Sequence, residues 1–148
     1  SQLFNSTVYD EIAFGPRQLG LTEEEVSQRV QDTLSLLKIE DLRDRVPYQL
    51  SGGEKKKVAF ASIMVTNPDV YILDEPFNNL SKEYEEFFRE LLHELHSAGK
   101  TIIMSAHHFK HLHHEKADVL LFEDGKADFF PAQEVLSNQQ VVERLSHY

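Results

Sequence analysis

Leu50-Ser51-Gly52-Gly53-Glu54 is the first of two short stretches that decide the fold of this chain. The second is Val70-Tyr71-Ile72-Leu73-Asp74-Glu75-Pro76. One places a hydroxyl and two glycines where a helix is predicted to begin, and the other is an apolar strand that ends in two carboxylates. Their chemistry predicts an α/β protein with places for a phosphate group and a divalent cation.

The anion site would lie at Ser51, Gly52 and Gly53. Main-chain N–H groups and the positive end of the helix dipole attract an anion there, and glycines let a phosphate come close. A plain helix cap explains the same residues, since Ser51 and Glu54 would cap each other. The acidic strand end that follows in the sequence favours the binding role.

Two carboxylates and a histidine are the candidate catalytic groups. Asp74 ends the apolar strand, where a carboxylate can hold Mg²⁺. Glu75 follows it and could polarise an attacking water as general base, although an acidic turn before Pro76 is the structural alternative. His107 follows a predicted strand, where a neutral imidazole could contact a γ-phosphate or the attacking water.

Five histidines near this point offer a different interpretation. If a helix begins near residue 109, three of them approach one face and could bind Zn²⁺ or Ni²⁺. Histidines without a ligand are also common on exposed helices. The cluster consists of His107, His108, His111, His113 and His114.

Composition narrows the class of protein. A chain of 148 residues is long enough for one domain or part of one. The net charge of −10 argues against a nucleic-acid partner and against direct adhesion to anionic lipid. The chain has no cysteine, which excludes a disulfide framework. Its apolar runs are short, which predicts no membrane insertion. Ser1 begins directly on motif-like sequence, from which we expect a segment of a longer protein.

Residues 1–57 are predicted to be mostly helical. Three acceptor side chains each precede an acidic residue by three positions, as in capping boxes: Thr7 with Asp10, Thr22 with Glu25, and Ser51 with Glu54. Val26, Val30, Leu34 and Leu37 form one apolar face after Thr22. Gly15-Pro16 and Pro47 are expected to separate the helices.

The second half alternates strands and a helix. Strands are predicted at Val70–Leu73, Thr101–Met104 and Val119–Phe122, with a helix from Glu83 to about His96. Strands separated by helices indicate a parallel sheet with crossover connections.

These motifs closely resemble the ATP-binding-cassette (ABC) ATPases. The resemblance covers essentially the whole chain: the signature at 50–54, the Walker B strand 70–74 with Glu75, a D-loop-like segment at 78–81 and a switch-type His107. Residues 2–15 are similar to the cobalt/energy-coupling-factor importer branch. The resemblance implies a partial P-loop NTPase fold, with a helical subdomain at 1–57 and the C-terminal part of the RecA-like core at 58–148.

The resemblance also implies function. Members of the family hydrolyse ATP with Mg²⁺ in a dimer that sandwiches the nucleotide. Ser51, Gly52, Gly53 and Glu54 would bind ATP held by a second ATPase subunit, which is either identical or different. Asp74 would hold Mg²⁺, while Glu75 and His107 would be catalytic. Residues 1–57 would include the surface that docks a transmembrane coupling subunit, at the cytoplasmic face of the membrane.

Three features depart from the family pattern. The Gly-x-x-x-x-Gly-Lys-Ser/Thr phosphate loop, the adenine-stacking aromatic and the Q-loop glutamine do not occur in the 148 residues. Ser81 stands where the D-loop usually has aspartate, and His108 replaces a common acidic residue. We therefore expect this segment alone to be inactive. With the central strand of the family's sheet missing, it should self-associate or rearrange.

Two other functions are consistent with the sequence. One is an ABC ATPase without a transport role, which the importer-like first residues disfavour. The other is a metal-binding regulatory module built on the histidine cluster, without nucleotide turnover.

Overall fold

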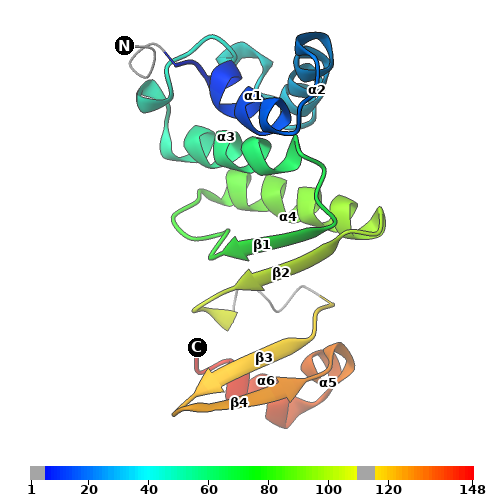
Figure 1. Cartoon of the computed structure of the whole chain (residues 1–148). Helices are drawn as coiled ribbons and strands as arrows, with labels where there is room; N and C mark the ends of the chain where they lie inside the picture. The colour runs from blue at the N-terminus through cyan, green and yellow to red at the C-terminus, as the bar shows by residue number, and fades with distance from the viewer. Residues whose placement is uncertain (1–5, 110–115) are drawn as a thin grey trace. The chain divides into compact units, whose positions relative to one another are not determined.

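The computed structural model describes residues 6–109 and 116–148 (Figure 1). Contacts between residues divide the chain into two compact units. The first comprises Ser1–Tyr71 and Asn79–Thr101, and the second comprises Ile72–Asn78 and Ile102–Tyr148. The helical subdomain predicted at 1–57 lies inside the first unit; the division at residue 57 itself stays a prediction.

The first unit begins with three helices, α1 (Val8–Gln18), α2 (Glu23–Leu36) and α3 (Gly52–Met64). All three predicted capping boxes are confirmed, because the hydroxyl of Thr7, Thr22 or Ser51 accepts from the N–H three residues on. Two short 3₁₀ helices, η2 (Glu40–Leu42) and η3 (Pro47–Gln49), connect α2 to α3.

Buried aliphatic residues join these helices. The predicted apolar face of α2 is confirmed, and its side chains pack with those of α1 in a core that solvent does not reach. This core contains Val8, Ile12, Val26, Val30, Leu34 and Leu37.

Pro16 does not end a helix, contrary to the sequence expectation. It lies inside α1, which continues to Gln18. A proline near the end of a helix removes one hydrogen bond, and burial of its ring in the core offsets that loss. Pro47, by contrast, begins η3 as expected.

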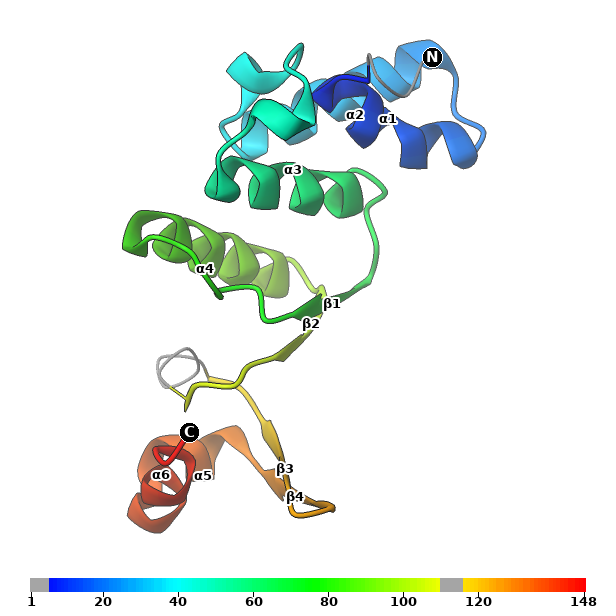
Figure 2. The same ribbon diagram turned by 90° about the vertical axis from the view of Figure 1, so that its left-hand side faces the viewer.

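A strand, helix and strand follow, namely β1 (Val70–Asp74), α4 (Lys82–Ser97) and β2 (Thr101–Ser105). β1 and β2 form a two-stranded parallel sheet, as predicted. Helices α3 and α4 lie side by side in both views (Figures 1 and 2). The Phe60 ring on α3 meets Phe88 on α4 edge to face and stacks on Tyr71 of β1, each pair of centroids 5.8 Å apart.

The last strand prediction was only partly right. β3 (Val119–Glu123) pairs antiparallel with β4 (Lys126–Phe130) and does not extend the β1–β2 sheet. Asp124 and Gly125 both have positive φ, at 48° and 75°. A two-residue turn of this kind matches strand twist and returns the chain antiparallel.

One face of the β3–β4 hairpin packs on α5 (Ala132–Ser137) and α6 (Gln139–Leu145). This small core contains Phe109, Val119, Leu121, Phe130, Val135, Val141 and Leu145. Within residues 6–109 and 116–148, no helix has the length and apolar character needed to cross a membrane.

Candidate functional site

The residues 51–54 form the first turn of α3, in the first unit. The Ser51 hydroxyl accepts from the Glu54 N–H at 3.2 Å, and Glu54 Oε1 accepts from the Ser51 N–H at 3.0 Å. The second bond is the main cause that lowers the pKa of Glu54. The capping interpretation is therefore confirmed, and it uses the N–H groups of Ser51 and Glu54 but not those of the two glycines.

The two glycines have different surroundings. A Cβ added to Gly52 would meet no atom within 4 Å, whereas a Cβ on Gly53 would lie 2.7 Å from the ring of Tyr84 on α4. Gly52 thus leaves space beside the helix start, which is where a phosphate would approach. Gly53 allows α3 and α4 to pack closely.

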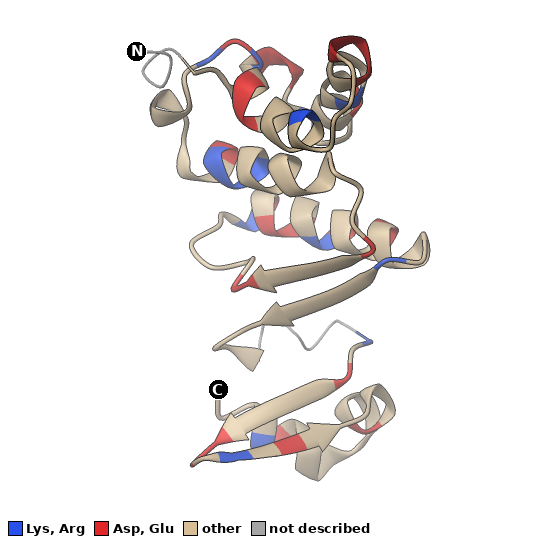
Figure 3. Cartoon of the chain, viewed as in Figure 1, with Lys and Arg blue, Asp and Glu red and all other residues tan. Residues whose placement is uncertain are grey.

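Positive charge gathers at the start of α3, although the chain as a whole is acidic (Figure 3). Of the three lysines at 55–57, Lys57 has a structural role. Its Nζ donates to the Leu37 carbonyl at 3.1 Å and lies 4.0 Å from the centroid of the Phe87 ring. Burial is the main cause that lowers the pKa of Lys57. Lys55 is exposed near the helix start.

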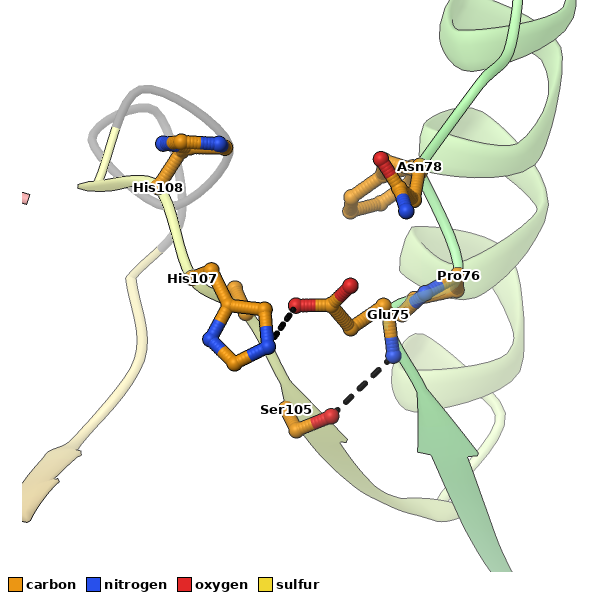
Figure 4. Close-up of a pocket in the computed structure, with 8 residues that line it drawn as sticks. Glu75, Pro76, Asn78, Ser105, His107 and His108 are labelled. Carbon is orange, nitrogen blue, oxygen red and sulfur yellow. Dashed lines mark hydrogen bonds and ion pairs between the residues drawn. The ribbon is translucent and has the colours of Figure 1, made fainter.

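The acidic site lies in the second unit, at the carboxyl ends of β1 and β2. A pocket opens between the segments that follow the two strands (Figure 4). Glu75 has a φ of 47°, so the chain turns sharply after Asp74. The lining residues are Glu75, Pro76, Phe77, Asn78, Ser105, Ala106, His107 and His108.

Glu75 and His107 meet inside this pocket. Glu75 Oε1 lies 3.0 Å from His107 Nε2, and the two side chains point toward each other (Figure 4). The Glu75 side chain is 23% exposed, whereas that of His107 is 84% exposed. A half-buried carboxylate that contacts an open imidazole is suited to exchange protons with a small molecule in the pocket.

Ser105 is a residue of this site that the sequence interpretation missed. Its Oγ donates to Asp74 Oδ1 at 2.5 Å and accepts from the Glu75 N–H at 3.1 Å. A hydroxyl at the end of an apolar strand was the available signal. Its partners could not be inferred without the register between β1 and β2.

The other predicted features have mixed outcomes. Ser81 caps α4 as expected, because its hydroxyl accepts from the Tyr84 N–H at 3.3 Å. His108 Nδ1 lies 3.0 Å from the carbonyl of Tyr148. His111, His113 and His114 lie outside the described residues. Among the residues that are described, no three side chains form a group able to hold a metal ion.

Each group of candidate residues is assembled within one unit. Ser51, Gly52, Gly53 and Glu54 come together at the start of α3. Asp74, Glu75 and His107 come together, with Ser105, at the ends of β1 and β2. The first group leaves open space at Gly52, and the second joins the carboxylate of Glu75 to the imidazole of His107 next to Asp74.

Comparison with known proteins identifies the family of this chain. The sequence profile of the ABC transporter family matches residues 1–78. The nickel import ATP-binding protein LarO of Lactiplantibacillus plantarum is 54% identical over 109 residues, which are 74% of this chain and 45% of LarO. The energy-coupling factor transporter ATP-binding protein EcfA of Carboxydothermus hydrogenoformans is 35% identical, over 97% of this chain and 53% of EcfA.

A solved structure gives the same result. CbiO1 of Clostridium perfringens, part of the ABC transporter complex CbiONQ, superposes with a TM-score of 0.78 at 32% identity. The superposition covers 97% of this chain and 58% of CbiO1. The chain therefore belongs to the ABC transporter family and has part of the P-loop NTPase fold of its ATP-binding domains, as predicted. It spans about half the length of the curated relatives it matches.

Proposed function

We propose that this chain is the signature-bearing portion of the ATPase subunit of an ABC importer. In the complete protein it would power import by binding and hydrolysing ATP in a nucleotide-sandwich dimer. The observation that supports this proposal most directly is the 3.0 Å contact between Glu75 and His107. Glu75 is the residue that follows Asp74 in the sequence. The name of LarO, a nickel import ATP-binding protein, supports the direction of transport.

Asp74 and two side chains of the pocket, Glu75 and His107, have distinct roles in this proposal. Asp74 would hold Mg²⁺, which would neutralise charge on the phosphate oxygens. Glu75 accepts a proton from the attacking water. His107 contacts the γ-phosphate and keeps the Glu75 carboxylate directed into the pocket. Asp74 stands at the end of β1, and its carboxylate offers the oxygen ligands that Mg²⁺ takes.

The signature residues act on a different nucleotide in this scheme. Ser51, Gly52 and Gly53 bind the γ-phosphate of ATP that the second ATPase subunit holds. The open space at Gly52 and the helix start fit an anion. Glu54 belongs to the same binding group, because it holds the Ser51 main chain in the cap.

The proposed function also implies two protein partners. A second ATPase subunit, identical or different, completes the sandwich, and a transmembrane coupling subunit docks on the helical subdomain at 1–57. Residues 58–148 form the C-terminal part of the nucleotide-binding core. The protein would be peripheral, at the cytoplasmic face of the membrane.

The 148 residues alone are expected to lack ATPase activity. They contain no phosphate loop, so the β- and γ-phosphates of ATP have no lysine and no cradle of N–H groups in this segment. Positioning accounts for most of the catalysis of phosphoryl transfer, and a site without it is inactive.

Steady-state ATP hydrolysis by the complete protein with its partner subunits tests the proposal. Glu75→Gln should lower kcat by about 100-fold or more, since it removes the base, while ATP binding persists. Glu86→Gln, at an exposed position of α4, is the matched control and should leave kcat unchanged. Unaltered turnover in Glu75→Gln would refute the catalytic assignment.

A further inference from the structure

One hydroxyl connects Asp74 at the end of β1 with Glu75 in the pocket. Ser105, the last residue of β2, donates to Asp74 Oδ1 at 2.5 Å and accepts from the Glu75 N–H at 3.1 Å. A serine hydroxyl has one proton to donate and lone pairs to accept. Donation to Asp74 therefore fixes the rotation of the hydroxyl, so that a lone pair faces the Glu75 N–H.

The accepted bond coincides with an unusual backbone conformation. Glu75 has a φ of 47°, in the left-handed region that non-glycine residues rarely adopt. Such a residue persists only where its surroundings hold it in place. The bond from its own N–H to Ser105 is a restraint of this kind, applied at the residue whose φ is positive.

This conformation determines where the Glu75 side chain points. The Cα–Cβ bond turns toward β2, and Oε1 reaches Nε2 of His107 at 3.0 Å. Figure 4 shows Ser105 and His107 on the same segment, with Glu75 opposite them. The Ser105 hydroxyl contacts the main chain of Glu75 and the carboxylate of Asp74, so it acts on the Glu75 side chain indirectly.

We propose that Ser105 is a positioning residue for the general base: by accepting from the Glu75 N–H, it holds Glu75 in the left-handed conformation that directs its carboxylate at His107. The inference rests on the function proposed above. It requires a hydroxyl at position 105 that accepts and donates at once, and it gives the Asp74 contact the role of orienting that hydroxyl.

The test compares three substitutions in the complete ATPase with its partner subunits. Ser105→Thr keeps the hydroxyl, Ser105→Val has nearly the shape of threonine without it, and Ser105→Ala removes it with little change in volume. We expect Ser105→Ala and Ser105→Val to lower kcat by about 10- to 100-fold, with KM for ATP within about threefold. The kcat of Ser105→Thr should stay within about threefold of the wild type. Equal losses of kcat in Ser105→Thr and Ser105→Val, or full turnover in Ser105→Ala, would overturn the proposal.

A double substitution shows whether Ser105 acts through Glu75. In a Glu75→Gln background, Ser105→Ala should lower the residual rate by less than about threefold, because the base is already gone. A further loss as large as that in the wild type would overturn the proposal. So would a Ser105→Ala variant whose only change is a greater Mg²⁺ requirement, since that assigns the effect to Asp74.

The two proposals fail separately. If Glu75→Gln leaves kcat unchanged, the catalytic function proposed for the pocket is wrong. If Glu75→Gln abolishes turnover and the Ser105 variants turn over normally, only the positioning role is wrong.

Discussion

At the scale of single residues, Gly52 and Gly53 are neighbours with different physical roles. Gly52 borders open space, and Gly53 lies against the ring of Tyr84. The sequence predicted both as residues that let a phosphate approach. Only the packing of α4 on α3 reveals that Gly53 is also needed to fit the two helices together.

Substitution by alanine should separate these roles. Gly53→Ala should lower the free energy of unfolding of the complete protein by about 1–3 kcal/mol, because its Cβ overlaps the Tyr84 ring. Gly52→Ala should change it by no more than about 0.5 kcal/mol. Urea titration followed by circular dichroism measures both values.

A second substitution, at Tyr84, tests whether the ring causes the loss of stability in Gly53→Ala. Adding Tyr84→Ala to Gly53→Ala removes the overlap, so the two substitutions should be non-additive. Strictly additive losses would show that the ring is not the source of the Gly53 effect.

The candidate catalytic residues were predictable because each is adjacent to a strand that its own sequence reveals. Asp74 and Glu75 follow the apolar run of β1, and His107 follows that of β2. The ends of neighbouring parallel strands meet at one edge of a sheet, which brings these residues together. Ser105 could not be assigned, since its two hydrogen bonds depend on register at atomic distances.

At the scale of elements, aromatic packing joins α3, α4 and β1. Phe60 lies between Tyr71 and Phe88. Tyr71 and Phe88 are 1% and 4% exposed. The helical periodicity of α4 predicted an apolar face but did not identify which residues of α3 it would contact.

Removing one aromatic ring from this cluster should destabilise the protein. Phe88→Ala should lower the free energy of unfolding by about 3–5 kcal/mol, because a buried ring leaves a cavity. Phe14→Ala is a matched control on α1, where the ring is 64% exposed, and should cost less than about 0.5 kcal/mol. Similar losses in both variants would contradict the packing described here.

The β3–β4 hairpin shows the limit of predicting elements from periodicity. A strand was expected at Val119–Phe122 and β3 covers it, but its pairing was not expected. Two positive φ values at Asp124 and Gly125 return the chain onto itself, so the partner of β3 is the next segment of the sequence. Apolar runs alone do not distinguish these alternatives.

At the scale of the whole molecule, apolar side chains face solvent on the β1–β2 sheet. Tyr71 and Leu73 are buried, while Val70, Ile72 and Ile103 are exposed; Ile72 is 75% exposed. Apolar sheet surfaces and open strand edges favour association with other chains.

The 148-residue chain should therefore self-associate in solution. Light scattering at increasing concentration should give a molecular mass above that of the monomer. Ile72→Thr combined with Ile103→Thr should shift the mass toward the monomer, because the apolar face loses area. Ile63→Thr on α3 makes the same kind of change elsewhere and should have no effect. A clean monomer of the unsubstituted chain would contradict this expectation.

The capping box at Ser51 has a consequence for how genetic variants at this position are interpreted. The Ser51 hydroxyl oxygen caps the N-terminus of α3, and the same side chain is proposed to bind a nucleotide held by the partner subunit. Loss of transport in a Ser51→Ala strain would therefore combine a weakened helix start with a missing phosphate contact. A Ser51→Asp strain keeps a capping oxygen but places negative charge beside the phosphate, so its phenotype would report on nucleotide recognition with folding largely preserved.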